Sequence, residues 1–394
     1  MRSVDVLVVG GGPGGLVAAR CAAEEDPGLE VLLVERDRAI GAPVRCAEGV
    51  GGPGLREFLD PHGADWVSRE IRRIVFIAPD GSETVLEAAH PAYILDRVRF
   101  EPVLADAARR AGAELRISTE VTALRRAGDR WVAMVRGPRG DEEVAARVVI
   151  GADGVESMVG RWAGLDTRVP SRDMESCAQY VVSNIAFDPD ALYLHFGERI
   201  APHGYAWVFP KGVGVANVGL GIVALHGKGR SARDWLDAYV AARYPDGAIS
   251  GSTVGGVIVA TTAKRTVTDG VMLIGDAAHQ VNPLSGGGII TAMKAGRIAG
   301  RLAARAVRDG DTSAARLQAY HAEWMALLGE DHRLYYRIKE ALNTFDDAFF
   351  NALSRTVNGI PPAKRSLGRV FAQALVRHPS LLPLAARLFV EAAL

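Results

Sequence analysis

Residues 4–23, VDVLVVGGGPGGLVAARCAA, contain the pattern most informative about the fold. Its apolar start, Val4–Val9, predicts a buried strand that runs through a glycine-rich turn into an alanine-rich helix. Gly10 allows the tight turn, Gly12 lets the backbone approach a diphosphate, and Gly15 lets the helix pack closely against the sheet. The N-terminus of the helix adds free N–H groups and the positive end of its dipole. These residues therefore predict a dinucleotide-binding unit.

A second apolar strand is expected at Glu30–Val34, and it ends in Glu35, twenty residues after Gly15. A carboxylate at this strand end accepts hydrogen bonds from the ribose hydroxyls of an adenosine. Glu35 therefore favours an adenosine that carries no 2′-phosphate. A glycine-rich turn can also be purely structural, but the complete order of strand, turn, helix, strand and acid favours cofactor binding.

The composition is that of an ordinary globular protein. The chain has 394 residues, enough for two or three domains, and its 46 Lys and Arg balance its 46 Asp and Glu. This balance gives no electrostatic reason to expect nucleic-acid binding. The widely spaced Cys21, Cys46 and Cys177 favour reduced thiols over disulfides or a zinc site, so no metal is predicted. Because no secretory signal or membrane-spanning run is found, we expect a cytoplasmic protein.

The order of apolar patterns predicts an α/β fold (α+β overall), in which a Rossmann-like cofactor domain is assembled from separate segments. An antiparallel, β-rich substrate domain is inserted into it, and a C-terminal helical region follows. Phe100–Ala111 and Gly288–Val307 are expected as helices, and Gly49–Gly54 as a loop. The expected boundaries are 1–60, 93–164 and 266–308 for the cofactor domain, 61–92 and 165–265 for the substrate domain, and 309–394 for the helical region.

Three further motifs follow the glycine turn. They are Glu35 at a strand end, Asp153-Gly154 within GADGVES, and Gly275-Asp276 within LIGDAAHQVNPLSGGGI. Together these motifs resemble the FAD-dependent oxidoreductases of the p-hydroxybenzoate hydroxylase structural type. The resemblance implies that Asp276 bonds the ribityl or diphosphate region of FAD and that the loop Pro283–Gly288 presents N–H groups to the flavin. A helix beginning there would also stabilise negative charge on the reduced flavin.

Arg97, within ILDRVRFEPVLADAA, matches an arginine that contacts the cofactor in this structural type. The alternative is a solvated charge at the start of a helix. The resemblance thus implies the following FAD-binding residues: Gly10, Gly12, Pro13, Gly14, Gly15, Glu35, Arg36, Arg45, Cys46, Ala47, Arg97, Val121, Asp153, Gly154, Gly275, Asp276, Pro283, Gly286, Gly287, Gly288 and Ile289.

Within this superfamily the chain resembles the geranylgeranyl reductase family, which saturates double bonds of isoprenoid chains. The resemblance is carried by IGAPVRCAEGV (40–50), PHGYAWVFPKGVGVANVGLGI (202–222) and NPLSGGGIITAMKAG (282–296). Ala47 stands where relatives usually have a glycine. His279 gives a GDAAH form that is common in flavin hydroxylases, but the continuation Gly286–Ile289 favours the reductases. We therefore expect a packing or hydrogen-bonding role for His279.

Saturating an isolated alkene needs a hydride from reduced flavin at one carbon and a proton at the other. Tyr205, Trp207 and Phe209 alternate along one expected strand, so they share a face and are expected to form an aromatic wall for the substrate. Their alternative role is sheet core. The resemblance places Cys46 near the flavin, where its thiol is expected to donate a proton or to tune access; an inert buried thiol is the alternative. Arg45 and Glu48 are expected to orient the loop, to bind a substrate phosphate or to be solvated.

The implied partner is an isoprenoid lipid or a prenyl diphosphate. An archaeal-type glycerolipid, a chlorophyll precursor, a quinone side chain and a free diphosphate all remain open, as do NAD(P)H, ferredoxin and deazaflavin as electron donors. An FAD-dependent aromatic monooxygenase and a non-catalytic electron carrier are the alternative functions, and Tyr205 and Phe209 depart from the halogenase pattern W-x-W-x-I-P. The leucine- and alanine-rich segment Leu381–Leu394 is expected to pack against the cofactor domain or to contact a membrane surface.

Overall fold

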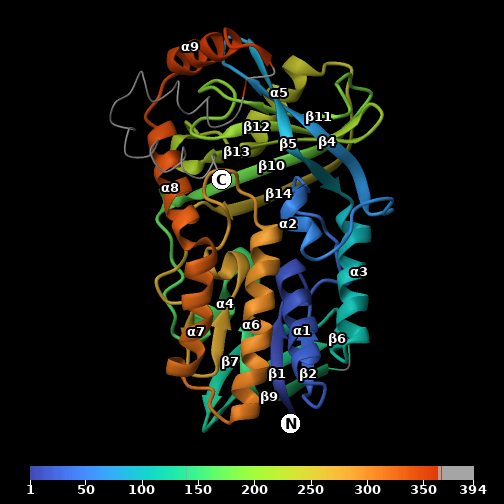
Figure 1. Ribbon diagram of the computed structural model, residues 1–394, viewed down its shortest axis with the longest axis vertical. Coiled ribbons are helices and arrows are strands. Elements are labelled where there is room, and N and C mark those ends of the chain that lie inside the picture. Colours follow the sequence, from blue (N-terminus) through green and yellow to red (C-terminus); the bar gives the residue numbers. More distant parts are fainter. Residues whose placement is uncertain (139, 363–364, 366–394) are drawn as a thin grey trace. The chain divides into compact units, whose positions relative to one another are not determined.

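The computed structural model describes residues 1–138, 140–362 and 365, and it divides the chain into two compact units (Figure 1). The segment Leu381–Leu394 lies outside the described residues. The first unit contains Met1–Val44, Arg97–Val169 and Val257–Arg333, and the second contains Arg45–Asp96, Pro170–Gly256 and the described residues from Leu334 onward. The division differs from the expected boundaries, because residues 45–60 belong to the second unit and 309–333 to the first.

The first unit is built on a mainly parallel sheet. Among the described residues its order is β15-β16-β9-β1-β2-β6, with the hairpin β7-β8 attached to β9. The central strands contain buried apolar runs, such as Val6–Val9 of β1 and Val31–Val34 of β2, as a sheet covered on both faces requires. The strands are β1 (Arg2–Val9), β2 (Val31–Val34), β6 (Glu114–Arg116), β7 (Glu120–Ala127), β8 (Arg130–Gly137), β9 (Gly140–Gly151), β15 (Val267–Thr268) and β16 (Val271–Leu273).

Two helices of this unit, α1 (Pro13–Glu25) and α6 (Ile289–Asp309), pack along each other (Figure 1). A Cβ atom placed on Gly296 would lie 2.2 Å from the carbonyl oxygen of Gly14, and one on Gly300 would lie 2.3 Å from that of Ala18. These contacts advance in the same direction along both helices, so α1 and α6 are parallel and their N-termini lie at the same end. The other helical segments are α3 (Arg97–Arg110), η1 (Gly154–Glu156), α4 (Met158–Trp162), η4 (Gly275–Ala278), α7 (Ala314–Trp324) and η5 (Met325–Gly329).

The second unit is built on a mixed, mainly antiparallel sheet with the order β14-β10-β13-β12-β11-β4-β5-β3 among the described residues. The expected α/β fold with a β-rich second part is confirmed. The strands are β3 (Gly49–Gly51), β4 (Val67–Ile77), β5 (Glu83–Leu95), β10 (Met174–Ser183), β11 (Ala191–His195), β12 (Tyr205–Gly212), β13 (Val215–Val223) and β14 (Ala248–Ile258). The helical segments are α2 (Gly52–Arg56), η2 (Ser171–Asp173), η3 (Ala224–His226), α5 (Ala232–Arg243), α8 (Glu330–Leu342), which begins in the first unit, and α9 (Asp347–Asn358).

The two faces of this sheet differ. On one face, apolar side chains of β10, β12 and β13 pack against Trp235, Leu236, Tyr239 and Val240 of α5 and form the core of the unit. The opposite face, called the site face here, consists of the remaining alternate positions, because residues paired across strands share a face. The site face carries Glu175, Cys177 and Gln179 of β10, Asn217, Gly219 and Gly221 of β13, and Tyr205, Trp207 and Phe209 of β12.

One local expectation is wrong. Gly49–Gly54 is not a loop, because Gly49–Gly51 pairs with β5 as strand β3 and Gly52 begins helix α2. Helix α5 lies within the region expected to be largely β. Its start was marked by a capping box, in which the Ser231 and Asp234 side chains each accept a hydrogen bond from the other residue's backbone N–H.

The helices of residues 1–138 and 140–362 include none with both the length and the apolar character needed to cross a bilayer.

Candidate active site

The expected site residues are divided between the two units. Arg45 is exposed, whereas Cys46 and Ala47 are partly buried. The first unit holds the other expected site residues, from Gly10 to Ile289, and the second holds Arg45, Cys46, Ala47, Glu48, Tyr205, Trp207 and Phe209.

The glycine turn after β1 brings backbone segments into direct contact. A Cβ on Gly10 would lie 2.2 Å from the carbonyl oxygen of Ala152, and one on Gly15 would lie 2.0 Å from that of Gly10. On Gly12, by contrast, a Cβ would meet nothing within 4 Å. The turn is therefore closely packed at Gly10 and Gly15 and open at Gly12, where the sequence predicts a diphosphate.

Helices α1 and α6 both begin without a side-chain cap from the described residues, since their N-caps are Gly12 and Gly288. The N–H groups of their first turns are therefore left for another acceptor. The contact between Gly14 and Ala292 places these two N-termini together, so the positive ends of two parallel helix dipoles lie at one end. An anion at this end relieves their mutual repulsion, and the diphosphate of a dinucleotide fits that requirement.

Glu35 is held at the end of β2 by two backbone N–H groups. Its Oε2 accepts from Gly11 N at 2.6 Å and its Oε1 accepts from Asp37 N at 2.8 Å. Each carboxylate oxygen keeps a further lone pair, so Glu35 retains capacity for ribose hydroxyls. The neighbouring Arg36 forms an ion pair with Glu156 at 2.6 Å and points its guanidinium to that carboxylate.

Two partly buried carboxyl groups lie beyond the turn. Asp153 accepts from Val159 N at 2.8 Å through Oδ2, while its Oδ1 is buried and has no hydrogen-bond partner among the described residues. Burial raises the pKa of Asp153, and burial also raises the pKa of Asp276, against the opposing effect of the Arg97 guanidinium. Arg97 also pairs with Glu101. A buried acceptor without a donor costs about 1–3 kcal/mol, so a cofactor hydroxyl at Asp153 would stabilise this arrangement.

The loop 283–288 is shaped by Asn282, whose Oδ1 accepts from Leu284 N at 2.9 Å and from Ser285 N at 3.2 Å. The loop leads to Gly288, where a Cβ would lie 3.4 Å from Asp276 Oδ1. His279 is buried, and its Nε2 lies 3.1 Å from the carbonyl oxygen of Thr167, in agreement with the expected hydrogen-bonding role.

Val121, on β7, packs its side chain into the hydrophobic core of the first unit. Any contact that it makes with a cofactor is therefore a backbone contact.

In the second unit, hydrogen bonds connect the loop that contains Cys46 to the site face. Trp207 Nε1 donates to Gln179 Oε1 at 2.9 Å, and Gln179 Nε2 donates to the carbonyl oxygen of Cys46 at 3.0 Å. Two residues expected to serve the reaction, Cys46 and Trp207, are thus held together through Gln179. The sequence analysis did not identify Gln179, because its position depends on the pairing of β10 with β13.

Glu48 is a buried residue that holds the same loop in place through its side-chain contacts. It is only 4% exposed and has a positive φ of 71°. Its Oε2 lies 2.7 Å from Lys211 Nζ and accepts from Asn217 Nδ2 at 2.8 Å. Lys211 also donates to the carbonyl oxygen of Leu95 at 2.7 Å. Removing one partner of such a buried pair typically costs about 3–5 kcal/mol, so of the roles expected for Glu48 this geometry favours orientation of the loop.

The three expected aromatic residues have different surroundings. Tyr205 and Trp207 lie edge to face with ring centroids 6.0 Å apart. The Trp207 ring lies over Gly219, where a Cβ would be 2.5 Å from Cζ2, whereas Phe209 lies over Gly49, where a Cβ would be 2.8 Å from Cε2. Tyr205 and Trp207 therefore line the site face together, and Phe209 packs against β3.

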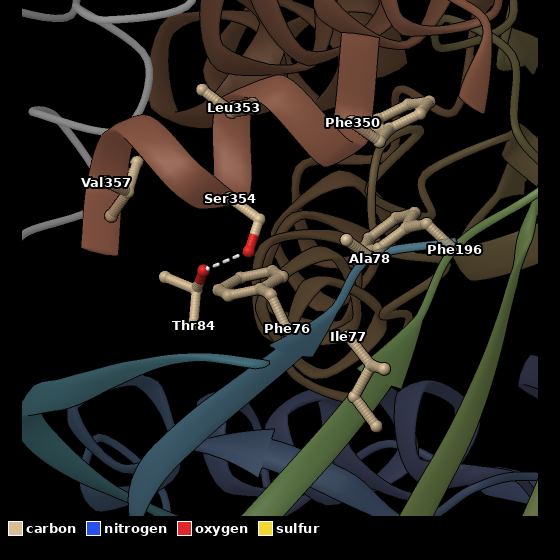
Figure 2. Close-up of a pocket in the computed structure, with 9 residues that line it drawn as sticks. All are labelled: Phe76, Ile77, Ala78, Thr84, Phe196, Phe350, Leu353, Ser354 and Val357. Carbon is tan, nitrogen blue, oxygen red and sulfur yellow. Dashed lines mark hydrogen bonds between the residues drawn. The ribbon is translucent and has the colours of Figure 1, made fainter. Parts of the chain in front are cut away.

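A row of aromatic rings continues from Tyr205 to a small apolar cavity of about 70 Å³, whose lining residues are drawn in Figure 2. Phe196 lies 5.9 Å from the Tyr205 ring centroid and stacks with both Phe76, at 6.1 Å, and Phe350, at 5.7 Å. The Thr84 and Ser354 hydroxyls bond each other at 2.9 Å, which leaves the lining apolar in character. The cavity lining comes from β4 and the residue after it, β5, α9 and the segment after β11, and consists of Phe76, Ile77, Ala78, Thr84, Phe196, Phe350, Leu353, Ser354 and Val357.

Known families match both parts of the chain. A model of the FAD-binding domain matches residues 3–192 and 252–328, and a model of the geranylgeranyl reductase catalytic domain matches residues 173–257. A digeranylgeranylglycerophospholipid reductase of Methanocella arvoryzae is 41% identical over 383 residues, which cover 96% of this chain and 97% of the relative. The chain belongs to the geranylgeranyl reductase family. As a member of this family it is an FAD-dependent reductase, and the first unit's open turn, uncapped helices and Asp153 fit that cofactor.

Two further relatives agree with this assignment. A digeranylgeranylglycerophospholipid reductase of Methanosphaerula palustris is 43% identical over 385 residues, covering 96% of each chain. A solved structure from Thermoplasma acidophilum, described as geranylgeranyl bacteriochlorophyll reductase-like, matches with a TM-score of 0.90 and 32% identity. The match covers 98% of this chain and 100% of that structure. The similarity therefore extends over both units.

Proposed function

We propose that this reductase saturates the double bonds of the two prenyl chains of a digeranylgeranylglycerophospholipid. The relatives of M. arvoryzae and M. palustris are named for this substrate, and each aligns with 96% of the chain. The observation that carries the proposal is the aromatic row that leads from Trp207 through Tyr205 and Phe196 to the apolar cavity. An extended chain of isoprene units needs such a continuous apolar surface, whereas a single small aromatic ring does not.

When bound and reduced, FAD would supply the hydride for the alkene. Since no carbonyl polarises an isolated double bond, holding the alkene in place and excluding water must lower the barrier. The Tyr205 and Trp207 rings hold the isoprene unit, and Gln179 keeps the Cys46 loop in position beside them. We assign the Cys46 thiol to this site as the group that donates a proton or limits access.

The test is an anaerobic turnover. The flavin is reduced with dithionite, digeranylgeranylglycerophospholipid or geranylgeranyl diphosphate is added, and flavin absorbance is followed together with the product mass. Reoxidation with a gain of two hydrogens per double bond, faster with the glycerolipid, is expected. No reoxidation with either substrate, together with rapid oxygen consumption in the presence of an aromatic compound, would contradict the proposal and favour a monooxygenase.

A paired variant tests the aromatic surface itself. Trp207→Phe keeps a ring over Gly219 but removes the N–H that Gln179 accepts, so the Cys46 loop loses one of its supports. We expect a several-fold loss of turnover with unchanged FAD content. Phe209→Leu, a change on the same strand against β3, serves as the control and is expected to have a smaller effect on turnover.

We also propose that the enzyme works at a membrane surface, because a diprenyl glycerophospholipid resides in a bilayer. Sedimentation with vesicles that contain this lipid, compared with vesicles that lack it, tests the contact.

The reductant that recharges the flavin belongs to one of three classes, NAD(P)H, a ferredoxin or a deazaflavin. Anaerobic mixing of the oxidised protein with each of them identifies the donor by the rate of flavin bleaching.

A further inference from the structure

The site face carries an acid that the proposed function has not used. Cys177, Gly221 and Tyr205 are paired across β10, β13 and β12, and Glu175 lies two residues before Cys177 on the same face. Because Gly221 has no side chain, its neighbours extend over it: a Cβ there would lie 2.9 Å from Glu175 Oε2 and 3.2 Å from Cys177 Sγ. The carboxyl group therefore reaches over Gly221 toward Tyr205, at the aromatic surface proposed to hold the alkene.

The charges around Glu175 leave its carboxyl group without a counter-ion. The cation that acts on this carboxyl group is Lys339 of α8, whose Nζ lies 2.8 Å from Asp173 Oδ1 and 3.4 Å from Glu340 Oε1. Asp173 in turn also accepts from the Tyr336 hydroxyl at 3.0 Å. The Glu175 side chain makes no hydrogen bond or ion pair with any of the described residues. Lys339 is thus paired with Asp173 and Glu340.

The remaining groups around Glu175 are weak acids. Cys177 faces it from its own strand and Tyr205 from β12, with Cys46 near Tyr205, and β14, which flanks β10, has no titratable residue. Burial raises the pKa of the Glu175 carboxyl to about 7, against the opposing effect of Lys339. Burial also raises the pKa of both Cys177 and Tyr205. Glu175 is therefore a stronger acid than either of these two neighbours, and near pH 7 a large fraction of its carboxyl groups still carries the proton.

We propose that Glu175 donates the proton that completes saturation of the double bond. In this step one alkene carbon receives the hydride, with its electron pair, that reduced FAD supplies. The π electrons of the alkene form the second C–H bond by taking the Glu175 proton at the other carbon. Glu175 is left as a carboxylate and regains a proton from water before the next reduction. The Cys46 loop then controls access to the alkene rather than proton supply.

The central test compares Glu175→Gln with the wild-type holoenzyme. Glutamine keeps the size of the side chain but holds no transferable carboxyl proton, and a general acid typically contributes about 10²–10⁴-fold to a rate. We expect at least a hundredfold fall in kcat for prenyl-lipid reduction, with FAD content and the substrate Kd within twofold of wild type. Wild-type kcat should fall as pH rises through about 7, because deprotonation removes the donor, and this fall should be absent from the variant.

An infrared titration of the FAD-free protein gives a readout that does not depend on turnover. A protonated-carboxyl band should disappear with a midpoint near pH 7 in the wild type and should be missing from Glu175→Gln. Glu175→Asp, which keeps an acid on a shorter side chain, should recover part of the activity together with the fall at high pH. This second variant also covers the case in which the glutamine variant fails to fold.

Two results would overturn the assignment of the proton donor. One is a Glu175→Gln enzyme with kcat within twofold of wild type. The other is an unchanged fall at high pH in that variant that Cys46→Ala abolishes, because the proton would then come from Cys46. This inference rests on the proposed function, and wild-type turnover separates the two: an enzyme that reduces no prenyl lipid refutes the proposed function, whereas only the variants decide the proton donor.

Discussion

The two units use glycine in opposite ways. In the first unit, Gly10 and Gly15 let backbone meet backbone, with Cβ positions only 2.2 and 2.0 Å from carbonyl oxygens. In the second unit, Gly219 and Gly221 let side chains of the neighbouring strands extend over the sheet, namely the Trp207 ring and the Glu175 carboxyl. The first arrangement presents backbone N–H groups to a cofactor whose phosphates are always the same. The second leaves a space whose chemistry is determined by the side chains around it, which suits a substrate site.

The largest effect is expected when a side chain is added at the close backbone contact between Gly15 and Gly10 in the first unit. In Gly15→Ala the new methyl group would lie 2.0 Å from the carbonyl oxygen of Gly10, so α1 would have to move away from the turn. Overpacking of this kind typically costs about 1–3 kcal/mol, and displacement of the helix N-terminus should also abolish FAD binding. Thermal unfolding of the apo-protein and FAD titration measure the two effects. Wild-type unfolding temperature and FAD affinity would show that the turn adapts to a side chain.

Gly12→Ala tests the effect of this turn on FAD binding separately from its effect on packing. Gly12 has a φ of −71°, and its Cβ would meet nothing within 4 Å, so the apo-protein should unfold at the wild-type temperature or slightly above it. FAD affinity should fall tenfold or more, because the methyl group would occupy the space expected for the diphosphate. Isothermal titration with FAD measures this fall. Unchanged affinity would place the diphosphate away from Gly12.

The contrast also explains what the sequence could predict. In the first unit the informative residues are contiguous or lie at strand ends, so the turn at Gly10–Gly15, Glu35 and Asp153 are readable without knowing the fold. In the second unit the alternation of Tyr205 and Trp207 correctly predicts one shared face. It does not identify Gln179 or Glu175, because only the register of β10 with β13 and of β13 with β12 brings them there.

Helix α5 and the stacking of Phe196 differ in whether neighbouring residues in the sequence indicate them. Helix α5 carries a local signal in the sequence, the capping box of Ser231 and Asp234, although it lies in a largely β region. The stacking of Phe196 between Phe76 and Phe350 had no local signal, because it joins β4, the end of β11 and α9. Long-range packing of this kind follows from topology, which short sequence motifs do not determine.

A smaller and more selective effect is expected when a side chain is added at Gly219 in the second unit, where the Trp207 ring lies over the sheet. In Gly219→Ala the added Cβ would lie 2.5 Å from Trp207 Cζ2 and 2.7 Å from the carbonyl oxygen of Ala178. The indole must tilt and weaken its bond to Gln179, so kcat/KM for the prenyl lipid should fall about tenfold, equivalent to about 1.4 kcal/mol. FAD affinity should remain that of the wild type. Gly212→Ala, whose nearest contact is Val215 at 3.9 Å, is the matched control and should retain full activity. A loss of FAD in Gly219→Ala would contradict the distinction between the two kinds of glycine.

The smallest effect is expected at the far end of the aromatic row, where the products should change more than the rate. Phe350→Trp places a larger ring in the cavity beside Phe196, so a prenyl chain can no longer extend fully into it. Double bonds that require the chain end to enter the cavity should remain unreduced, and partly saturated lipids should accumulate while the initial rate changes less than threefold. Mass spectrometry of the products over time measures this distribution. Phe349→Trp, on the same helix α9 but not part of the cavity lining, should give the wild-type products. If both variants saturate the chains completely, the cavity does not hold the chain end, and the substrate surface stops at Tyr205.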